Sequence, residues 1–264
     1  MREQPPVPKT IEMSGEQVLA NTAISDEERK LRVELAACYR LAQKNGWDEL
    51  VYNHITARVP GPEHHFLINS FGLAFDEVTA SNLVKVDLDG RVIGPARYPV
   101  NAAGFTIHSA IHAARPDVGC VIHLHTEAGM AISMLDGGLQ PLTQTAMFFQ
   151  SQMAFHAYEG IALNLAERER LVRDLADKSV MILRNHGTLV ACPTIGQAFV
   201  TMFLFEKAAR AQLRAMAGNV KIVPASPEAI EITAQFGKSG AGGAEYAWQA
   251  MVRRLDREDR SYKD

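Results

Sequence analysis

The sequence predicts a layered α/β domain of the α-β-α type, with a mostly antiparallel central sheet flanked by helices. Short apolar or alternating runs between turn signals predict strands, and longer amphipathic segments with capping residues predict helices. Asp89-Gly90 lies between two short apolar runs and favours a hairpin, which joins antiparallel strands directly. The length of 264 residues is typical of a single such domain.

The first helix is predicted to begin after Ser25. Ser25 and Glu28 have the spacing of a capping box, in which each side chain accepts a hydrogen bond from the other residue's backbone N–H. Asn45-Gly46 is expected to end the helix, because glycine tolerates the left-handed conformation that follows many helices. The apolar face of this helix holds Leu31, Leu35, Cys38 and Ala42.

The first strand is predicted over residues 51–59, where side chains alternate between two faces. Asn53 and Ile55 point to one face, whereas His54 and Thr56 point to the other. A strand of this kind is buried on both faces when helices cover the sheet on both sides. The predicted strands cover residues 51–59, 66–69, 83–88, 91–93, 119–125 and 180–183.

The later helices are predicted from their caps and stops. A helix over residues 105–115 stops at Pro116, Thr126 begins the next, and Thr194 begins a long helix that ends near residue 217. Ser226-Pro227 has the pattern of an N-cap followed by proline at the first helical position. Two amphipathic helices complete the set, over residues 163–178 and 245–255.

The sequence predicts that the chain divides into three parts. Residues 1–24 are rich in proline and polar side chains and are expected to form an N-terminal arm. Residues 25–236 form the α/β domain, and residues 237–264 form a glycine-rich break followed by a C-terminal helix and tail.

Composition excludes several classes of protein. Thirty acidic and 27 basic residues give a net charge of −3, which is not the basic footprint of a nucleic-acid-binding protein. No apolar run is long enough to cross a bilayer, and the N-terminus lacks the apolar core of a signal peptide. The three cysteines lie far apart, which argues against a disulfide scaffold and indicates a reducing compartment, the cytoplasm.

The most informative segment is Val121-Ile-His-Leu-His125. Residues two apart on a strand point to the same face, so His123 and His125 project side by side as half of a metal site. His186 follows a second buried strand and is the candidate third ligand, with Gly187 expected to let the backbone turn sharply. Buried histidines that only complete a core are the alternative, although two imidazoles on an apolar strand need polar partners.

A second histidine pair, His108 and His112, is spaced four residues apart on the helix over residues 105–115. A zinc protease needs glutamate directly after the first histidine, where this chain has Ser109. Packing within the helix layer, or an interface, is therefore favoured for this pair.

Several motifs together resemble the class II aldolase/adducin family, over residues 25–217. The resemblance implies the family fold, a divalent metal ion held by histidines, and a C4 tetramer with active sites at subunit clefts. The segments that carry it are Leu50-Val-Tyr-Asn-His-Ile-Thr-Ala-Arg58, Ile68-Asn-Ser-Phe-Gly72, Ala103-Gly-Phe-Thr-Ile-His108, Ala113-Ala-Arg-Pro-Asp117, Val121-Ile-His-Leu-His125 and Arg184-Asn-His-Gly187.

The resemblance also implies roles for single residues. His123, His125 and His186 match the family's metal ligands, with zinc as the expected ion and iron, manganese or cobalt as alternatives. The substrate pocket is expected to include Asn53, Ser70, Gly72 and Gly104.

Gly104 is a departure from the family pattern. Sugar-phosphate aldolases carry a catalytic glutamate at this position, and the two serines that precede it are replaced here by Ala102 and Ala103. The candidates for replacement acid or base groups are Glu127, Tyr158 and Glu159.

Three functions are consistent with these residues. The first is a metal-dependent lyase of the aldolase or decarboxylase type, in which three histidines hold a Lewis-acid metal that acts on a small carbonyl or hydroxy acid. The second is a non-haem iron oxygenase on the same scaffold, and the third is a non-catalytic adducin-like interaction module. The expected partners are a small-molecule substrate and further copies of the chain, without nucleic acid or membrane.

Overall fold

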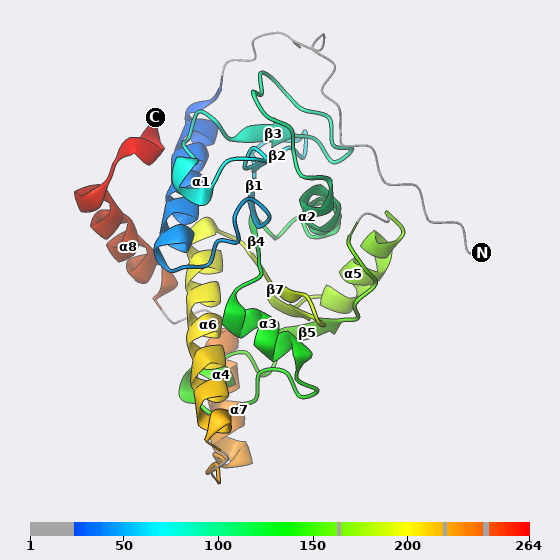
Figure 1. Cartoon of the computed structure of the whole chain (residues 1–264), viewed down its shortest axis with the longest axis vertical. Helices are drawn as coiled ribbons and strands as arrows, with labels where there is room; N and C mark the ends of the chain where they lie inside the picture. The colour runs from blue at the N-terminus through cyan, green and yellow to red at the C-terminus, as the bar shows by residue number, and fades with distance from the viewer. Residues whose placement is uncertain (1–23, 163–164, 219–220, 240–242) are drawn as a thin grey trace.

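Seven strands form one sheet in the order β3-β2-β1-β4-β7-β6-β5, with helices on both faces (Figure 1). The computed structural model describes residues 24–162, 165–218, 221–239 and 243–264, so the predicted arm lies almost entirely outside the described residues. Every strand pair is antiparallel except β5 with β6. The predicted α-β-α class with a mostly antiparallel sheet is confirmed.

The elements follow the predicted order closely. The strands are β1 (His54–Arg58), β2 (Phe66–Ile68), β3 (Val84–Val86), β4 (Cys120–Leu124), β5 (Met153–His156), β6 (Val180–Leu183) and β7 (Gly187–Cys192). The α-helices are α1 (Asp26–Lys44), α2 (Ala102–Ala114), α3 (Glu127–Met134), α4 (Gln144–Met147), α5 (Glu167–Leu175), α6 (Ile195–Ala217), α7 (Pro227–Lys238) and α8 (Ala244–Glu258). Two 3₁₀ turns, η1 (Phe75–Glu77) and η2 (Ser261–Lys263), complete the described elements.

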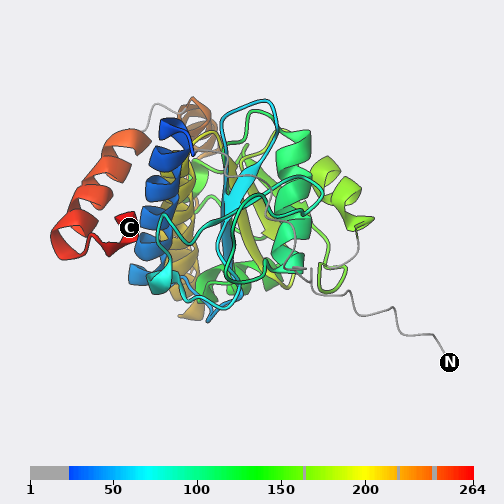
Figure 2. The same cartoon turned by 90° about the horizontal axis from the view of Figure 1, so that it is seen from above.

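The two faces of the sheet bury different cores. One face of β1 and β4, represented by Ile55 and Ile122, packs with α1 and α6 in the larger apolar cluster. The opposite face carries Val121, which clusters with Ile107 of α2 and Leu171 of α5. Viewed from above, the sheet lies between the α1, α6 and α8 side and the α2 and α5 side (Figure 2). The alternation of the sequence therefore assigns each side chain of β1 and β4 to one helical layer.

Local signals placed most helix starts correctly. The hydroxyls of Thr126, Thr194 and Ser226 each accept a hydrogen bond from a backbone N–H in the first turn of α3, α6 and α7. Ser25 likewise accepts from the backbone N–H of Glu28, 3.1 Å away. The reciprocal half of the predicted capping box is wrong, because the Glu28 carboxylate instead binds Arg32 and Lys85.

Strands β5 and β7 and the short helix α4 are not among the predicted elements, and β7 begins where only a turn after His186 is expected. The second half of the predicted hairpin at Asp89-Gly90 is reduced to a single bridge between Val86 and Val92. The predicted helix over residues 163–178 narrows to α5, and residues 163–164 lie outside the described residues.

The C-terminal segment packs on the domain. Trp248 of α8 and Tyr262 of η2 are buried in the same core as α1 and α6. The division at residue 237 stays a prediction, because α7 continues to Lys238 and residues 240–242 are not described. None of the described helices is long and apolar enough to span a membrane.

Candidate metal centre

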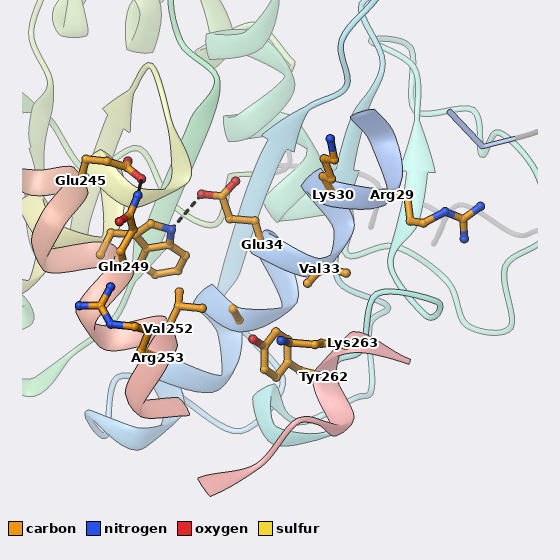
Figure 3. Close-up of a pocket in the computed structure, with 12 residues that line it drawn as sticks. Arg29, Lys30, Val33, Glu34, Glu245, Gln249, Val252, Arg253, Tyr262 and Lys263 are labelled. Atoms are coloured by element: carbon orange, nitrogen blue, oxygen red, sulfur yellow. Dashed lines mark hydrogen bonds between the residues drawn. The ribbon is translucent and has the colours of Figure 1, made fainter. Parts of the chain in front are cut away.

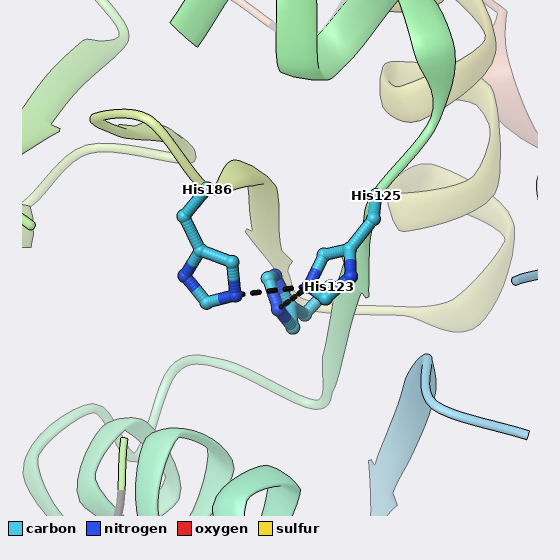
Figure 4. Close-up of side chains that lie close together, drawn as sticks. All are labelled: His123, His125 and His186. Carbon is cyan, nitrogen blue, oxygen red and sulfur yellow. Dashed lines mark hydrogen bonds between the residues drawn. The ribbon is translucent and has the colours of Figure 1, made fainter. Parts of the chain in front are cut away.

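Three histidines from distant parts of the chain meet at one end of the sheet. His123 lies in β4, His125 follows the strand, and His186 lies in the turn between β6 and β7. The Nε2 atom of His125 is 3.0 Å from Nε2 of His123 and 2.9 Å from Nε2 of His186 (Figure 4). The structure therefore brings together the three residues that the sequence predicted as ligands.

The outer nitrogens of two rings are held by groups that only accept hydrogen bonds. Nδ1 of His123 donates to the backbone carbonyl of Thr188 at 3.1 Å, and Nδ1 of His125 donates to the Glu49 carboxylate at 2.6 Å. With the proton on Nδ1, the Nε2 atom of each neutral ring presents a lone pair. His123 and His125 thus turn an acceptor nitrogen toward the cluster.

The cluster has the chemistry and nearly the spacing of a zinc site. Zinc–nitrogen bonds of about 2.0–2.1 Å in a tetrahedral site place the nitrogens about 3.3 Å apart, slightly more than the separations here. The facing lone pairs of His123 and His125, 3.0 Å apart, repel one another unless a cation lies between them. Three protein nitrogens also leave room for a substrate atom, as catalytic sites require.

Electrostatics keeps the rings of His123 and His186 unprotonated near neutral pH. Burial, with His186 and His125 nearby, holds the pKa of His123 well below its usual value. Burial and the neighbouring His125 lower the pKa of His186 to about 4. Neutral imidazoles bind metal without first releasing a proton.

The prediction that Gly187 lets the backbone turn at His186 is wrong. The left-handed residue is Asn185, with φ of 56°, a conformation that asparagine tolerates better than most residues. Gly187 is required for close approach, because a Cβ atom there would lie 2.5 Å from the Leu124 carbonyl oxygen and 3.1 Å from His125 Cδ2. This glycine lets β7 pass directly beside the end of β4.

The predicted substrate residues lie in different settings. Asn53 is fully buried, and its Oδ1 accepts from the backbone N–H of His125 at 3.4 Å, while its Nδ2 has no partner among the described residues. The Ser70 hydroxyl donates to the Asn82 carbonyl oxygen at 2.9 Å, and Gly72 occupies an exposed turn with φ of 103°. Gly104 is buried in the first turn of α2.

The three acid or base candidates also differ. The Tyr158 ring is 55% exposed, and its centroid lies 6.2 Å from that of His186. Glu127 is exposed in the first turn of α3. Glu159 is paired with Arg170, and that hydrogen bond lowers the pKa of the glutamate. Tyr158 is therefore the candidate whose position next to the cluster the structure supports best.

The predicted pair His108 and His112 belongs to a larger buried group that also holds His54 and Thr56, which the sequence did not link to the pair. The Thr56 hydroxyl contacts Nδ1 of His108 at 2.7 Å and Nε2 of His112 at 2.8 Å, so these two histidines of α2 pack around a buried hydroxyl. His54 lies beside them, and burial, with His125 and His186 nearby, lowers its pKa to about 3. The alternation of residues 51–59 was the available signal, since it put His54 and Thr56 on one face.

A wide cavity of about 580 Å³ lies elsewhere, between α1, α8 and η2 (Figure 3). Its floor includes Trp248, whose indole N–H donates to Glu34 at 2.9 Å, and its rim carries Arg29, Lys30 and Arg253. No histidine lines it. A much smaller hollow of about 10 Å³ adjoins His186 and Tyr158. The larger of these two cavities is therefore not the one beside the histidine cluster.

Comparison with known proteins agrees with this geometry. The profile of the family described as "Class II Aldolase and Adducin N-terminal domain" matches residues 33–213. A solved aldolase II superfamily protein from Pseudomonas syringae is 47% identical, with a TM-score of 0.86, over 91% of this chain and 98% of that one.

Two further relatives carry different names. An L-fuculose 1-phosphate aldolase from Glaciozyma antarctica PI12 is 31% identical, with a TM-score of 0.79, over 93% of this chain and 96% of that one. Alpha-adducin of Rattus norvegicus is 41% identical over 87% of this chain, but the match covers only 33% of that protein.

Proposed function

The chain belongs to the class II aldolase and adducin family, and from that premise we propose that it is a metal-dependent carbon–carbon lyase acting on a small carbonyl or hydroxy-acid substrate. The observation that carries the proposal is the convergence of three Nε2 atoms, two of them on rings whose Nδ1 is held by an acceptor. We propose zinc as the resident ion, with iron, manganese or cobalt as alternatives, because imidazole nitrogens suit all of them.

Residues of the chain have separate proposed roles in the reaction. When bound, the divalent ion supplies Lewis acidity toward a carbonyl oxygen. Glu49 and the Thr188 carbonyl fix the rings of His125 and His123, so the ligand geometry is set before substrate arrives. We assign the role of proton donor to the Tyr158 hydroxyl, because this ring lies 6.2 Å from that of His186 between centroids, with Glu127 and Glu159 as the other acid or base candidates.

The reaction type that we favour follows from the lack of a basic side chain at residue 104. A glycine supplies no base to remove a C–H proton, and losing a positioned base typically lowers the rate about 100- to 10,000-fold. Decarboxylation avoids this step, because the bond to CO₂ breaks, its electron pair passes to the adjacent carbonyl, and a proton donor completes the product. Decarboxylation is therefore the form of lyase chemistry we favour.

A second copy of the chain is proposed to complete the site. Exposed apolar side chains lie on the segments that adjoin the histidines, namely the loop after α1, helix α3 and the loop after β5. These side chains are Leu50, Tyr52, Met134, Tyr158 and Ile161. Covering such a surface favours self-association, and a tetramer is the expected form. The cytoplasmic location stays a prediction.

The test is turnover by protein loaded separately with zinc, manganese, cobalt or ferrous iron, against a panel of small keto and hydroxy acids. We expect carbon–carbon cleavage that is lost in His186→Ala and retained in His64→Ala, a change at an exposed loop histidine. Oxygen consumption restricted to the iron form supports the oxygenase instead. Metal content unchanged in His123→Ala, together with no turnover, supports the adducin-like module.

A further inference from the structure

His54 is a buried imidazole whose hydrogen-bonding groups are unused. The side chain is 4% exposed, and neither ring nitrogen has a hydrogen-bond partner among the described residues. His108 and His112 nearby each have one nitrogen bonded to Thr56. Leaving a buried polar group unpaired destabilises the folded state, so such a group has a specific cause.

The position of His54 places it beside the histidine cluster. Its register partner in the sheet is His123, so the two side chains leave neighbouring strands on the same face. The adjacent Asn53 contacts the backbone of His125 and also has an unpartnered, fully buried Nδ2 group. Two adjacent residues at the start of β1 thus leave buried polar groups without partners, opposite the part of β4 that carries His123.

Gly104 provides the space that the His54 ring occupies. A Cβ atom at residue 104 would lie 2.5 Å from Cγ and Cδ2 of His54 and 2.7 Å from its Nδ1. Glycine within a helix is less favourable than alanine by about 1 kcal/mol. The ring therefore takes the place of a side chain on α2, and only glycine allows it.

The start of α2 is not free to bind a phosphate group. Exposed backbone N–H groups at a helix N-terminus bind phosphate in many proteins. Here Oδ1 of Asn101 accepts from the backbone N–H of Ala103 at 3.0 Å and of Gly104 at 3.4 Å. With these donors already used, and with Ala102 and Ala103 offering no hydroxyl, this helix end has little to give an anion.

We propose that His54 binds the substrate directly, and that the substrate is a small unphosphorylated α-hydroxy acid with a carbonyl group next to its hydroxyl-bearing carbon, seated between the three histidines and His54. Neutral imidazole offers one N–H and one lone pair, and the Asn53 amide adds N–H donors. A ligand with adjacent carbonyl and hydroxyl groups supplies the matching acceptors and donor. The inference rests on the proposed metal-dependent function and specifies its substrate class.

Binding to cobalt-loaded protein tests this without requiring turnover. The visible absorption of Co²⁺ reports titration with glycolate, 2-phosphoglycolate or azide, which is a simple ligand that lacks the hydroxy-acid groups. His54→Leu is expected to bind cobalt and azide as the native chain does, while glycolate affinity falls about 10- to 100-fold. His54→Gln restores part of the loss, and Gly104→Ala, which displaces the ring, lowers glycolate affinity in the same way.

Thermal unfolding provides the second measurement. Because leucine removes an unpaired buried polar group, His54→Leu is expected to unfold at the same temperature as the native chain or higher. If His54 served only to pack the core, His54→Leu would cause no selective loss of glycolate binding. Equal glycolate affinity in His54→Leu and the native chain would overturn the proposal.

Two further results separate this inference from the proposed function. Native protein that binds cobalt and azide but not glycolate, or binds 2-phosphoglycolate about tenfold more tightly than glycolate, overturns the substrate class alone. Native protein that binds no divalent metal overturns the proposed function and this inference together.

Discussion

The Glu49 carboxylate lies 2.6 Å from Nδ1 of His125, and this contact sets which nitrogen of the ring faces the cluster. Glu49 sits in the loop between α1 and β1, and its side chain is 42% exposed, so the contact holds the ligand rather than the fold. A carboxylate partner of this kind also increases the basicity of a metal-binding imidazole.

Glu49→Gln is therefore expected to weaken metal binding about 10- to 100-fold while leaving the unfolding temperature of the metal-free protein unchanged. Competition with a chelating dye measures the affinity. Asp89→Asn, at an exposed hairpin residue, serves as the control and should bind metal normally. Native affinity in Glu49→Gln would show that the carboxylate does not support His125.

Gly187→Ala is expected to destabilise the protein by about 1–3 kcal/mol, because the added Cβ meets the Leu124 carbonyl oxygen at 2.5 Å. Metal affinity should fall as well, since the same atom presses on His125. Urea unfolding and metal titration measure the two effects. Gly137→Ala faces only the flexible end of Gln140, and a similar loss there would refute the steric explanation.

Thr56→Val removes the hydroxyl shared by His108 and His112 without changing the volume greatly. Two buried ring nitrogens lose their partner, so the free energy of unfolding is expected to drop by about 2–4 kcal/mol. Thr79→Val, at a hydroxyl that contacts Ser81 near the surface, should change stability by less than about 0.5 kcal/mol. Equal effects in urea unfolding would contradict the assigned role of Thr56.

Stability is expected to fall as pH drops from about 6.5 toward 3. Burial lowers the pKa of His54 and of His112 to about 3, well below their value in an unfolded chain. In this window the unfolded state binds protons that the folded state does not, so each histidine removes about 1.4 kcal/mol per pH unit. Urea unfolding of chelator-treated protein at several pH values measures the slope. A flat profile would mean that these rings titrate normally when folded.

Much of the fold was predictable because its signals are local. The caps at Thr126, Thr194 and Ser226 determine helix starts through bonds to residues three positions away. Alternation in β1 and β4 assigned side chains to faces, which put His123 on the face that also carries His54. The missed β7 had no such signal, since it is buried at every position and follows a tight turn at Asn185.

By itself, the sequence determined the capped starts of α1, α3, α6 and α7, the two-faced strands and the three imidazoles that form the candidate centre. Only the tertiary structure decided that Glu49 orients His125, that Gly187 is needed for close approach rather than for turning, and that Gly104 makes room for His54. The physical reason is the sequence separation over which each interaction acts. Capping and alternation act within a few residues, whereas these contacts join segments about 50 to 80 positions apart. Tertiary packing alone fixes which of these segments meet.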